Sequence, residues 1–188
     1  EQAIENAFKN SPAQSNGQYA ILRTSWVYGD GGNFIRTILR LAKERESLNI
    51  ISDQHGVPTS AEWLAQVSLD LVLREDGQIK RFPSGIYHAV PSGETTWHGL
   101  ATLAAQVAGV AGASLKVKPG AIKPILAVEY PLPATRPMNS RMARSVLEAA
   151  LTDSLGSSSN MTKSRLLGQS WQPQVAAYVQ DLVHRKLI

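Results

Sequence analysis

The chain has 188 residues, of which 43% are hydrophobic and 18% charged, a composition typical of one globular domain and not of a disordered protein. Nineteen basic and fifteen acidic residues give a net charge of +4 without long runs of like charge, so no nucleic-acid partner is indicated. The absence of cysteine excludes a disulfide scaffold, a thiolate zinc site and a cysteine nucleophile, and it fits a cytoplasmic protein. The longest nearly uncharged stretch, residues 101–115, is too short to span a bilayer, so no membrane partner is expected.

The first half of the chain alternates predicted helices with predicted strands. In chain order we expect a helix end over residues 1–9, a turn region over 10–18, a strand over 19–23 and a helix over 33–42. A strand over 48–51, a loop over 53–59 and a helix over 62–74 follow. The strand at 19–23 lacks strict alternation of apolar and polar residues, as expected of a strand buried on both faces in a parallel sheet. Asn33 is a strong helix N-cap, and apolar residues follow it at helical spacing.

The second half continues the alternation and ends in a helix. In chain order we expect a strand over residues 85–90, a helix over 95–108, a strand over 115–118 and a proline-rich irregular segment over 127–137. A helix over 139–150, a low-complexity loop over 156–160 and a closing helix over 172–186 follow. Thr95 or Thr96 caps the first of these helices, and Gly109 stops it. Strands alternating with helices predict an α/β fold.

Several motifs of common enzymes are missing from the sequence. It contains no Gly-x-Gly-x-x-Gly dinucleotide fingerprint, no P-loop and no Gly-x-Ser-x-Gly nucleophile elbow. None of the five tyrosines is followed four positions later by lysine, so a Tyr-x-x-x-Lys proton-donor pair is absent too. The four histidines do not fall at metal-ligand spacing. We therefore predict no catalytic residue, no cofactor-binding residue and no metal ligand within this chain.

The glycine-rich segment 29–32 is the first candidate ligand-binding feature, because it joins a strand end to the helix that begins at Asn33. Glycines let the backbone approach a ligand, and the first N–H groups of a helix can face an anion. Three basic residues follow at helical spacing, namely Arg36, Arg40 and Lys43. This side of the helix is either a diphosphate-binding edge or a solvated face balanced by Glu44 and Glu46.

Trp26 and Arg136 are two further candidates. Trp26 lies just past the carboxyl end of a predicted strand, where ligands bind in open α/β sheets, so its ring either packs against a sugar or covers the core. Arg136 lies in the proline-rich segment and is a candidate contact for an anion.

Taken together, these segments resemble the dTDP-4-dehydrorhamnose reductase family of extended short-chain dehydrogenases/reductases. The matching strings follow the family's order over about residues 1–147 and comprise 21–29, Asn33-Phe34, Leu39-Arg40-Leu41, Glu44-Arg45, Asp53-Gln54, Gly56, Pro58-Thr59, Gly85-Ile86-Tyr87-His88, Gly93, Thr96-Trp97, Tyr130-Pro131, Pro133-Ala134, Arg136-Pro137 and Ser140. Enzymes of this family reduce the 4-keto group of dTDP-4-dehydro-L-rhamnose to give dTDP-L-rhamnose, with NADPH or sometimes NADH as the cofactor.

The resemblance implies that residues 1–188 are the C-terminal, substrate-binding part of such a reductase. The expected fold is a Rossmann-like sheet remnant plus a small substrate-binding domain, with the dinucleotide-binding half and its Tyr–Lys pair outside this chain. The chain alone is then expected neither to catalyse nor to bind NADP(H) or NAD(H). It is also expected to form a homo-oligomer, because strands whose neighbours lie in the other half would have exposed edges.

The resemblance also implies a binding site for a dTDP-sugar. Its expected members are Trp26, Asn33, Phe34, Gln54, Pro58, Thr59 and Arg136. Trp26 would lie against the sugar, and Arg136 would lie near the diphosphate. Three residues depart from the family pattern, Trp63, Ala143 and Val146, where Asp, Asp and Lys are usual. These departures leave two alternatives open: a reductase for another nucleotide-sugar, and a non-catalytic regulatory subunit similar to the beta subunit of methionine adenosyltransferase.

Overall fold

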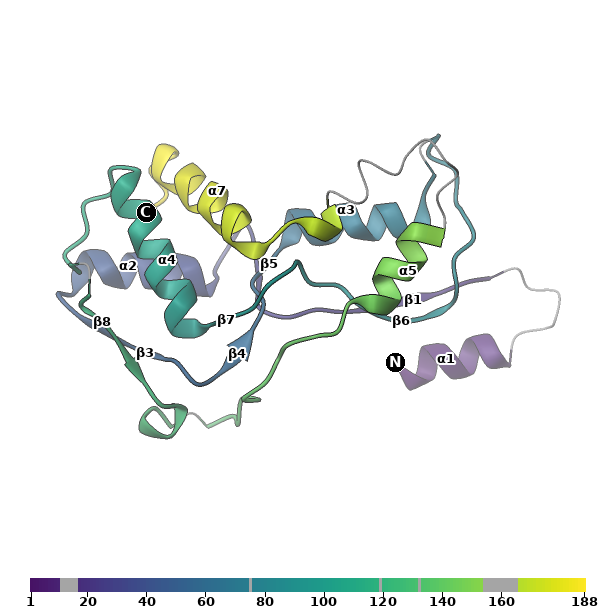
Figure 1. Ribbon diagram of the computed structural model, residues 1–188, viewed down its shortest axis with the longest axis horizontal. Helices are drawn as coiled ribbons and strands as arrows, with labels where there is room; N and C mark the ends of the chain where they lie inside the picture. The colour runs from purple at the N-terminus through teal and green to yellow at the C-terminus, as the bar shows by residue number, and fades with distance from the viewer. Residues whose placement is uncertain (11–16, 75, 119, 132, 154–165) are drawn as a thin grey trace.

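The computed structural model describes residues 1–10, 17–74, 76–118, 120–131, 133–153 and 166–188, and it confirms a mixed α/β fold (Figure 1). The helices are α1 (Gln2–Lys9), α2 (Phe34–Glu44), α3 (Ala61–Val72), α4 (Trp97–Val110), the 3₁₀ helix η1 (Ala127–Glu129), α5 (Ser145–Asp153) and α7 (Trp171–His184). The strands are β1 (Ala20–Arg23), β2 (Val27–Tyr28), β3 (Leu48–Ile51), β4 (His55–Gly56), β5 (Thr59–Ser60), β6 (Gly85–His88), β7 (Thr95–Thr96) and β8 (Ile122–Ile125).

The strands pair two by two. β1 runs parallel to β6, β2 to β5 and β3 to β8, whereas β4 pairs with β7 in the antiparallel sense. The pairs β1–β6 and β3–β8 join strands that are far apart in the sequence, with a helix between them, as parallel connections require. None of the described helices is both long and apolar enough to cross a membrane.

Helices α2, α4 and α7 pack together at one end of the molecule (Figure 1). Their shared core holds aliphatic side chains such as Leu39, Leu100, Val175 and Val179, all of which are buried. The α4 face toward this core is rich in alanine, which lets neighbouring elements approach closely. Because α2 also buries Ile38 in a second cluster against β3 and β8, it is held from two sides.

Helices α3 and α5 lie with β1 and β6 at the other end (Figure 1). Their core contains Trp63, Val67, Tyr87 and Leu147, and the Trp63 indole N–H donates to the Leu166 carbonyl at 3.1 Å. Trp63, one of the departures from the family pattern, is thus 4% exposed and part of the core.

Most predicted elements are confirmed within a few residues, but four predictions are wrong. Residues 115–118 form no strand: the N–H groups of Lys116 and Val117 both donate to the carbonyl of Ala42, and the strand paired with β3 is 122–125. The helix predicted from 139 begins only at Ser145, because the chain at 138–140 is hydrogen-bonded to both sides of the His55 backbone. The predicted loop over 53–59 contains β4 and the start of β5, and the predicted irregular segment 127–137 begins with the short helix η1. The predicted loop at 156–160 lies outside the described residues.

The α2–α4–α7 core predicts a clear difference between two substitutions in α4. Leu100 is 2% exposed, so Leu100→Ala is expected to lower the free energy of unfolding by about 2–5 kcal/mol through lost burial and a cavity. Val110 lies at the end of the same helix and is 84% exposed, so Val110→Ala is expected to change it by less than about 0.5 kcal/mol. Urea unfolding of both variants measures this, and equal effects would contradict the core assignment.

Candidate functional site

An aromatic cluster forms where the chain enters α2 and α4. The Trp26 and Trp97 rings are stacked, with centroids 3.8 Å apart and planes inclined by 18°. Phe34 packs on Trp97 with a centroid distance of 4.5 Å and an angle of 51°. Phe34 and Trp97 are the first residues of α2 and α4, so both helix starts converge on Trp26.

Trp26 adopts a backbone conformation that bulky residues rarely take. Its φ is 46°, in the left-handed region, which costs about 1–3 kcal/mol and persists only where the surroundings enforce it. Here the Trp26 carbonyl accepts a hydrogen bond from the Thr59 N–H at 3.3 Å, and the indole lies against Gly56. A Cβ atom on Gly56 would be 2.5 Å from the Trp26 ring, so only glycine allows this approach.

Gln54 connects this cluster to the adjoining loop. Its side-chain oxygen accepts a hydrogen bond from the Trp97 indole N–H at 3.2 Å, and the residue is 6% exposed. Within the described part of the chain, the amide nitrogen of Gln54 makes no hydrogen bond, so it can donate to a ligand.

Beside the aromatic cluster lies a cleft of about 920 Å³. Its walls come from α2, β3, β8 and the segment 129–140, and its lining includes Trp26, Phe34, Arg45, Asn49, Gln54, Trp97, Glu129, Tyr130, Arg136 and Ser140. One wall is therefore aromatic and another carries charge. The size suits a ligand larger than a single sugar ring.

The charged groups of the cleft are predominantly cationic. The guanidinium groups of Arg45 and Arg136 are exposed, and neither forms an ion pair or hydrogen bond among the described residues. The one carboxylate in the lining, that of Glu129, accepts the Leu126 N–H at 2.6 Å and so caps η1. Two free guanidinium groups at one cleft favour an anionic ligand with more than one charged oxygen, such as a diphosphate.

The structure brings four of the seven predicted site residues together in this cleft: Trp26, Phe34, Gln54 and Arg136. The other three lie outside its lining. The Asn33 side chain accepts from the Arg36 N–H and donates to the Gly29 carbonyl and the Tyr178 hydroxyl. Pro58 and Thr59 are buried, and the Thr59 hydroxyl donates to the Val57 carbonyl. In this structure these three residues hold the loops that shape the cleft.

The basic face of α2 does not reach the cleft. Arg36, Arg40 and Lys43 are absent from its lining, and Arg40 pairs with Glu44 at 2.9 Å. The structure therefore favours the second interpretation for Arg40, in which it belongs to a solvated face balanced by acidic residues.

Sequence reasoning missed Arg45, Trp97 and Tyr130 as members of the site. All three lie in segments that match the family, but the pattern gives them no role, and only the fold shows which matched positions face one cleft. Among the described residues, no group of three or more His, Cys, Asp or Glu side chains could hold a metal ion.

Comparison with known proteins gives one consistent family. Residues 1–167 match the family described as the RmlD substrate binding domain. The chain is 46% identical over 127 residues to the dTDP-4-dehydrorhamnose reductase of Escherichia coli, covering 67% of this chain and 41% of that protein. It is 40% identical over 141 residues to the protein of the same name from Burkholderia thailandensis, covering 72% of this chain and 47% of that protein.

Solved structures agree with the sequence relatives. A dTDP-4-dehydrorhamnose reductase from Clostridium acetobutylicum superposes with a TM-score of 0.66 at 29% identity, over 88% of this chain and 49% of that one. The corresponding protein from Bacillus anthracis, solved in complex with NADP, gives 0.65 at 27% identity, over 88% and 49%. The chain thus spans less than half the length of each of these relatives.

The contact between Gly56 and Trp26 predicts the effect of a single methyl group. Gly56→Ala is expected to displace the Trp26 indole, disturb its stacking on Trp97 and lower the free energy of unfolding by about 1–3 kcal/mol. Gly32→Ala is the matched control, since a Cβ there would meet nothing within 4 Å. Near-ultraviolet circular dichroism and thermal unfolding measure both effects. An unchanged aromatic signal in Gly56→Ala would contradict the packing described.

Proposed function

This chain belongs to the RmlD substrate binding domain family, and we propose that it is the substrate-binding part of a reductase that converts dTDP-4-dehydro-L-rhamnose into dTDP-L-rhamnose. The relatives named dTDP-4-dehydrorhamnose reductase support the reaction. The observation that carries the proposal to this chain is the cleft in which Trp26, Gln54 and Arg136 meet. We also propose that the protein is cytoplasmic, because its composition and a pathway that uses nucleotide-sugars both fit that location.

We propose a task for each wall of the cleft. Arg45 and Arg136 would bind the diphosphate of the nucleotide-sugar, because a guanidinium can donate two parallel hydrogen bonds to phosphate oxygens. The Trp26 indole would lie beside the sugar and restrict its orientation. The free amide nitrogen of Gln54 would donate to a hydroxyl or carbonyl of the ligand.

A nicotinamide cofactor does not fit the residues that this chain provides. The loop between β2 and α2 lacks the glycine spacing of a dinucleotide fingerprint. At the start of α2, the Asn33 side chain already accepts a hydrogen bond from the Arg36 N–H. At the carboxyl end of β1, the glycine turn that such a site needs is replaced by Ser25 and Trp26. We therefore place the cofactor and the proton donor in another part of the reductase and derive no step through them.

The cofactor assignment predicts that the 188-residue chain has no measurable affinity for NADPH. Titration followed by NADPH fluorescence, with the dTDP-sugar experiment below as the positive control for folded protein, checks this expectation. Micromolar binding would show a dinucleotide site in this chain and contradict the assignment.

The proposed site predicts that each of two substitutions weakens dTDP-rhamnose binding. Arg136→Lys removes a bidentate contact worth about 1.5–3 kcal/mol and is expected to weaken binding by about 10- to 150-fold. Because lysine keeps the positive charge, the dependence of binding on salt should stay close to that of the unsubstituted chain. Trp26→Ala is expected to weaken binding without changing the salt dependence, because it removes an uncharged contact.

Calorimetric titration of the chain at two salt concentrations measures these effects. Arg40→Lys is the matched control, since Arg40 lies outside the cleft and pairs with Glu44. Unchanged binding in both Arg136→Lys and Trp26→Ala would contradict the proposed site. Tighter binding of another nucleotide-sugar than of dTDP-rhamnose would keep the site and change the substrate.

A further inference from the structure

Trp97 and Gln54 form a side-chain pair at the wall of the cleft. The antiparallel pairing of β4 with β7 aligns His55 with Thr96. Gln54 and Trp97 are the next residues on the two sides, so they lie opposite one another. The Trp97 indole N–H donates to the Gln54 side-chain oxygen at 3.2 Å, and both residues line the cleft. Thr96 accepts the Gly99 N–H at 3.1 Å and so caps α4, which holds Trp97 in place as the first residue of that helix.

This hydrogen bond fixes which end of the Gln54 amide is left free for a ligand. A side-chain amide can turn over, so that its oxygen and nitrogen exchange places, but an indole N–H is only a donor. The turned amide would set an N–H group of Gln54 against the N–H of Trp97, and neither could accept. The oxygen therefore stays on Trp97, and the amide nitrogen makes no hydrogen bond with the described residues. Gln54, which is 6% exposed, thus offers donors to the cleft and no free acceptor group beyond its bonded oxygen.

The pair belongs to the part of the cleft that the proposed function assigns to the sugar. Trp97 stacks on Trp26 with ring centroids 3.8 Å apart, and Trp26 is the residue placed beside the sugar. Gly56, two residues after Gln54, contacts the same Trp26 ring. A sugar beside Trp26 would therefore lie within reach of the Gln54 N–H groups.

We propose that Trp97 is a positioning residue that fixes Gln54 as a hydrogen-bond donor, so that the pair selects a sugar with an acceptor oxygen at this place. The inference rests on the proposed function and deepens it, because it assigns recognition of the sugar to two side chains. A keto or hydroxyl oxygen accepts from the amide N–H, whereas the ammonium group of an amino-sugar offers only donors and is disfavoured there. Arg45 and Arg136, by contrast, would bind the diphosphate whichever sugar it carries.

Calorimetric titration of the 188-residue chain with dTDP-rhamnose and with dTDP separates this role from a general loosening of the cleft. Trp97→Phe keeps an aromatic ring but removes the N–H, and Gln54→Met keeps the length of the side chain but removes its donors. Each is expected to weaken dTDP-rhamnose binding about 3- to 10-fold. The affinity for dTDP should stay unchanged, because dTDP lacks the rhamnose. Equal losses for both ligands would show a purely structural role and overturn the proposal.

The double variant tests whether Trp97 acts through Gln54. In the Gln54→Met background, Trp97→Phe is expected to cause no further loss of dTDP-rhamnose affinity, because the amide that it orients is already gone. A loss caused only by a shift of the Trp26 ring would persist in that background. A further loss as large as that of the single Trp97→Phe variant would therefore overturn the proposal.

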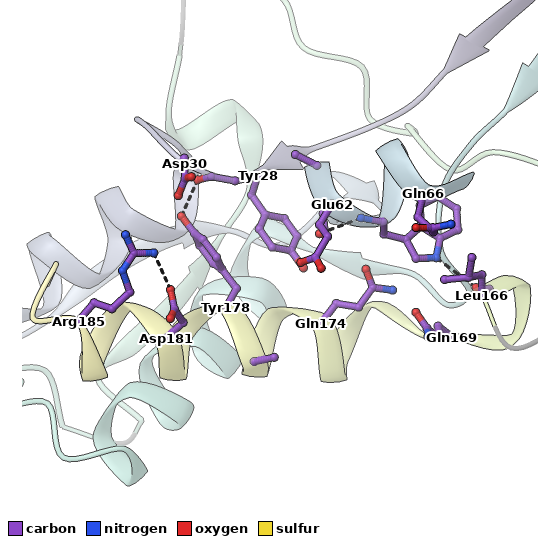
Figure 2. A pocket seen from close by; sticks show the side chains of 15 residues that line it. Tyr28, Asp30, Glu62, Gln66, Leu166, Gln169, Gln174, Tyr178, Asp181 and Arg185 are labelled. Carbon is purple, nitrogen blue, oxygen red and sulfur yellow. Dashed lines mark hydrogen bonds and ion pairs between the residues drawn. The ribbon is translucent and has the colours of Figure 1, made fainter. Parts of the chain in front are cut away.

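Trp63→Phe is the matched control, since it also removes an indole N–H, the one that donates to the Leu166 carbonyl at 3.1 Å. Both residues line a separate pocket between α3 and α7, which shares no lining residue with the cleft (Figure 2). This variant is expected to lower the melting temperature and to leave the affinity for dTDP-rhamnose unchanged.

The same titrations distinguish failure of this inference from failure of the proposed function. If Arg136→Lys weakens dTDP-rhamnose binding while Trp97→Phe and Gln54→Met do not, the inference is overturned and the proposed function stands. If the unsubstituted chain does not bind dTDP-rhamnose, both are overturned.

Discussion

The Trp26 indole rests on the bare backbone of Gly56 and stacks on Trp97, and this packing fixes the relative positions of four segments of the chain. The contact holds β4 against the end of β1, and it places the first residues of α2 and α4 beside one another through Phe34 and Trp97. The positive φ of Trp26 is a local cost, which the stack and the bond from the Thr59 N–H offset. Without this arrangement the cleft would lose its aromatic wall.

Positively and negatively charged side chains line two different hollows of the molecule, a separation that the net charge of +4 does not reveal. The cleft presents the guanidinium groups of Arg45 and Arg136, whereas a pocket between α3 and α7 is lined by the carboxylates of Glu62 and Asp30. None of these four groups is paired with another described residue. Asn33 lies between them, since it caps α2 on one side and bonds to Tyr178 on the other. The cleft with the two guanidinium groups therefore favours an anionic ligand.

The sequence predicts local structure well wherever one local signal decides it. Asn33 is the N-cap of α2 as its residue type suggests, and Thr96 caps α4 in the same way. The alternating residues at 115–118 mislead, because Val117 is buried in the cluster of α2, β3 and β8 but pairs with no strand among the described residues. The strand that pairs with β3 contains Pro124. Proline lacks the N–H that a ladder uses, and it is tolerated here because, among the described strands, β8 pairs only with β3.

The candidate site is predictable only in part, for a physical reason. Trp26 and Arg136 are identified by their resemblance to the family and do lie in one cleft, but the same resemblance gives no sign that Asn33 and Thr59 are engaged in hydrogen bonds of the fold. Whether a polar residue faces a ligand or a neighbouring loop depends on long-range packing. The sequence likewise does not show that the Tyr28 hydroxyl is buried without a hydrogen-bond partner among the described residues, because its burial depends on α7.

A crystal structure of the chain with dTDP-rhamnose tests the central claim most directly. We expect the diphosphate to lie between the guanidinium groups of Arg45 and Arg136, within hydrogen-bonding distance of both, with the sugar beside the Trp26 indole. A nucleotide-sugar bound at any other surface, or one whose diphosphate contacts neither arginine, would contradict it.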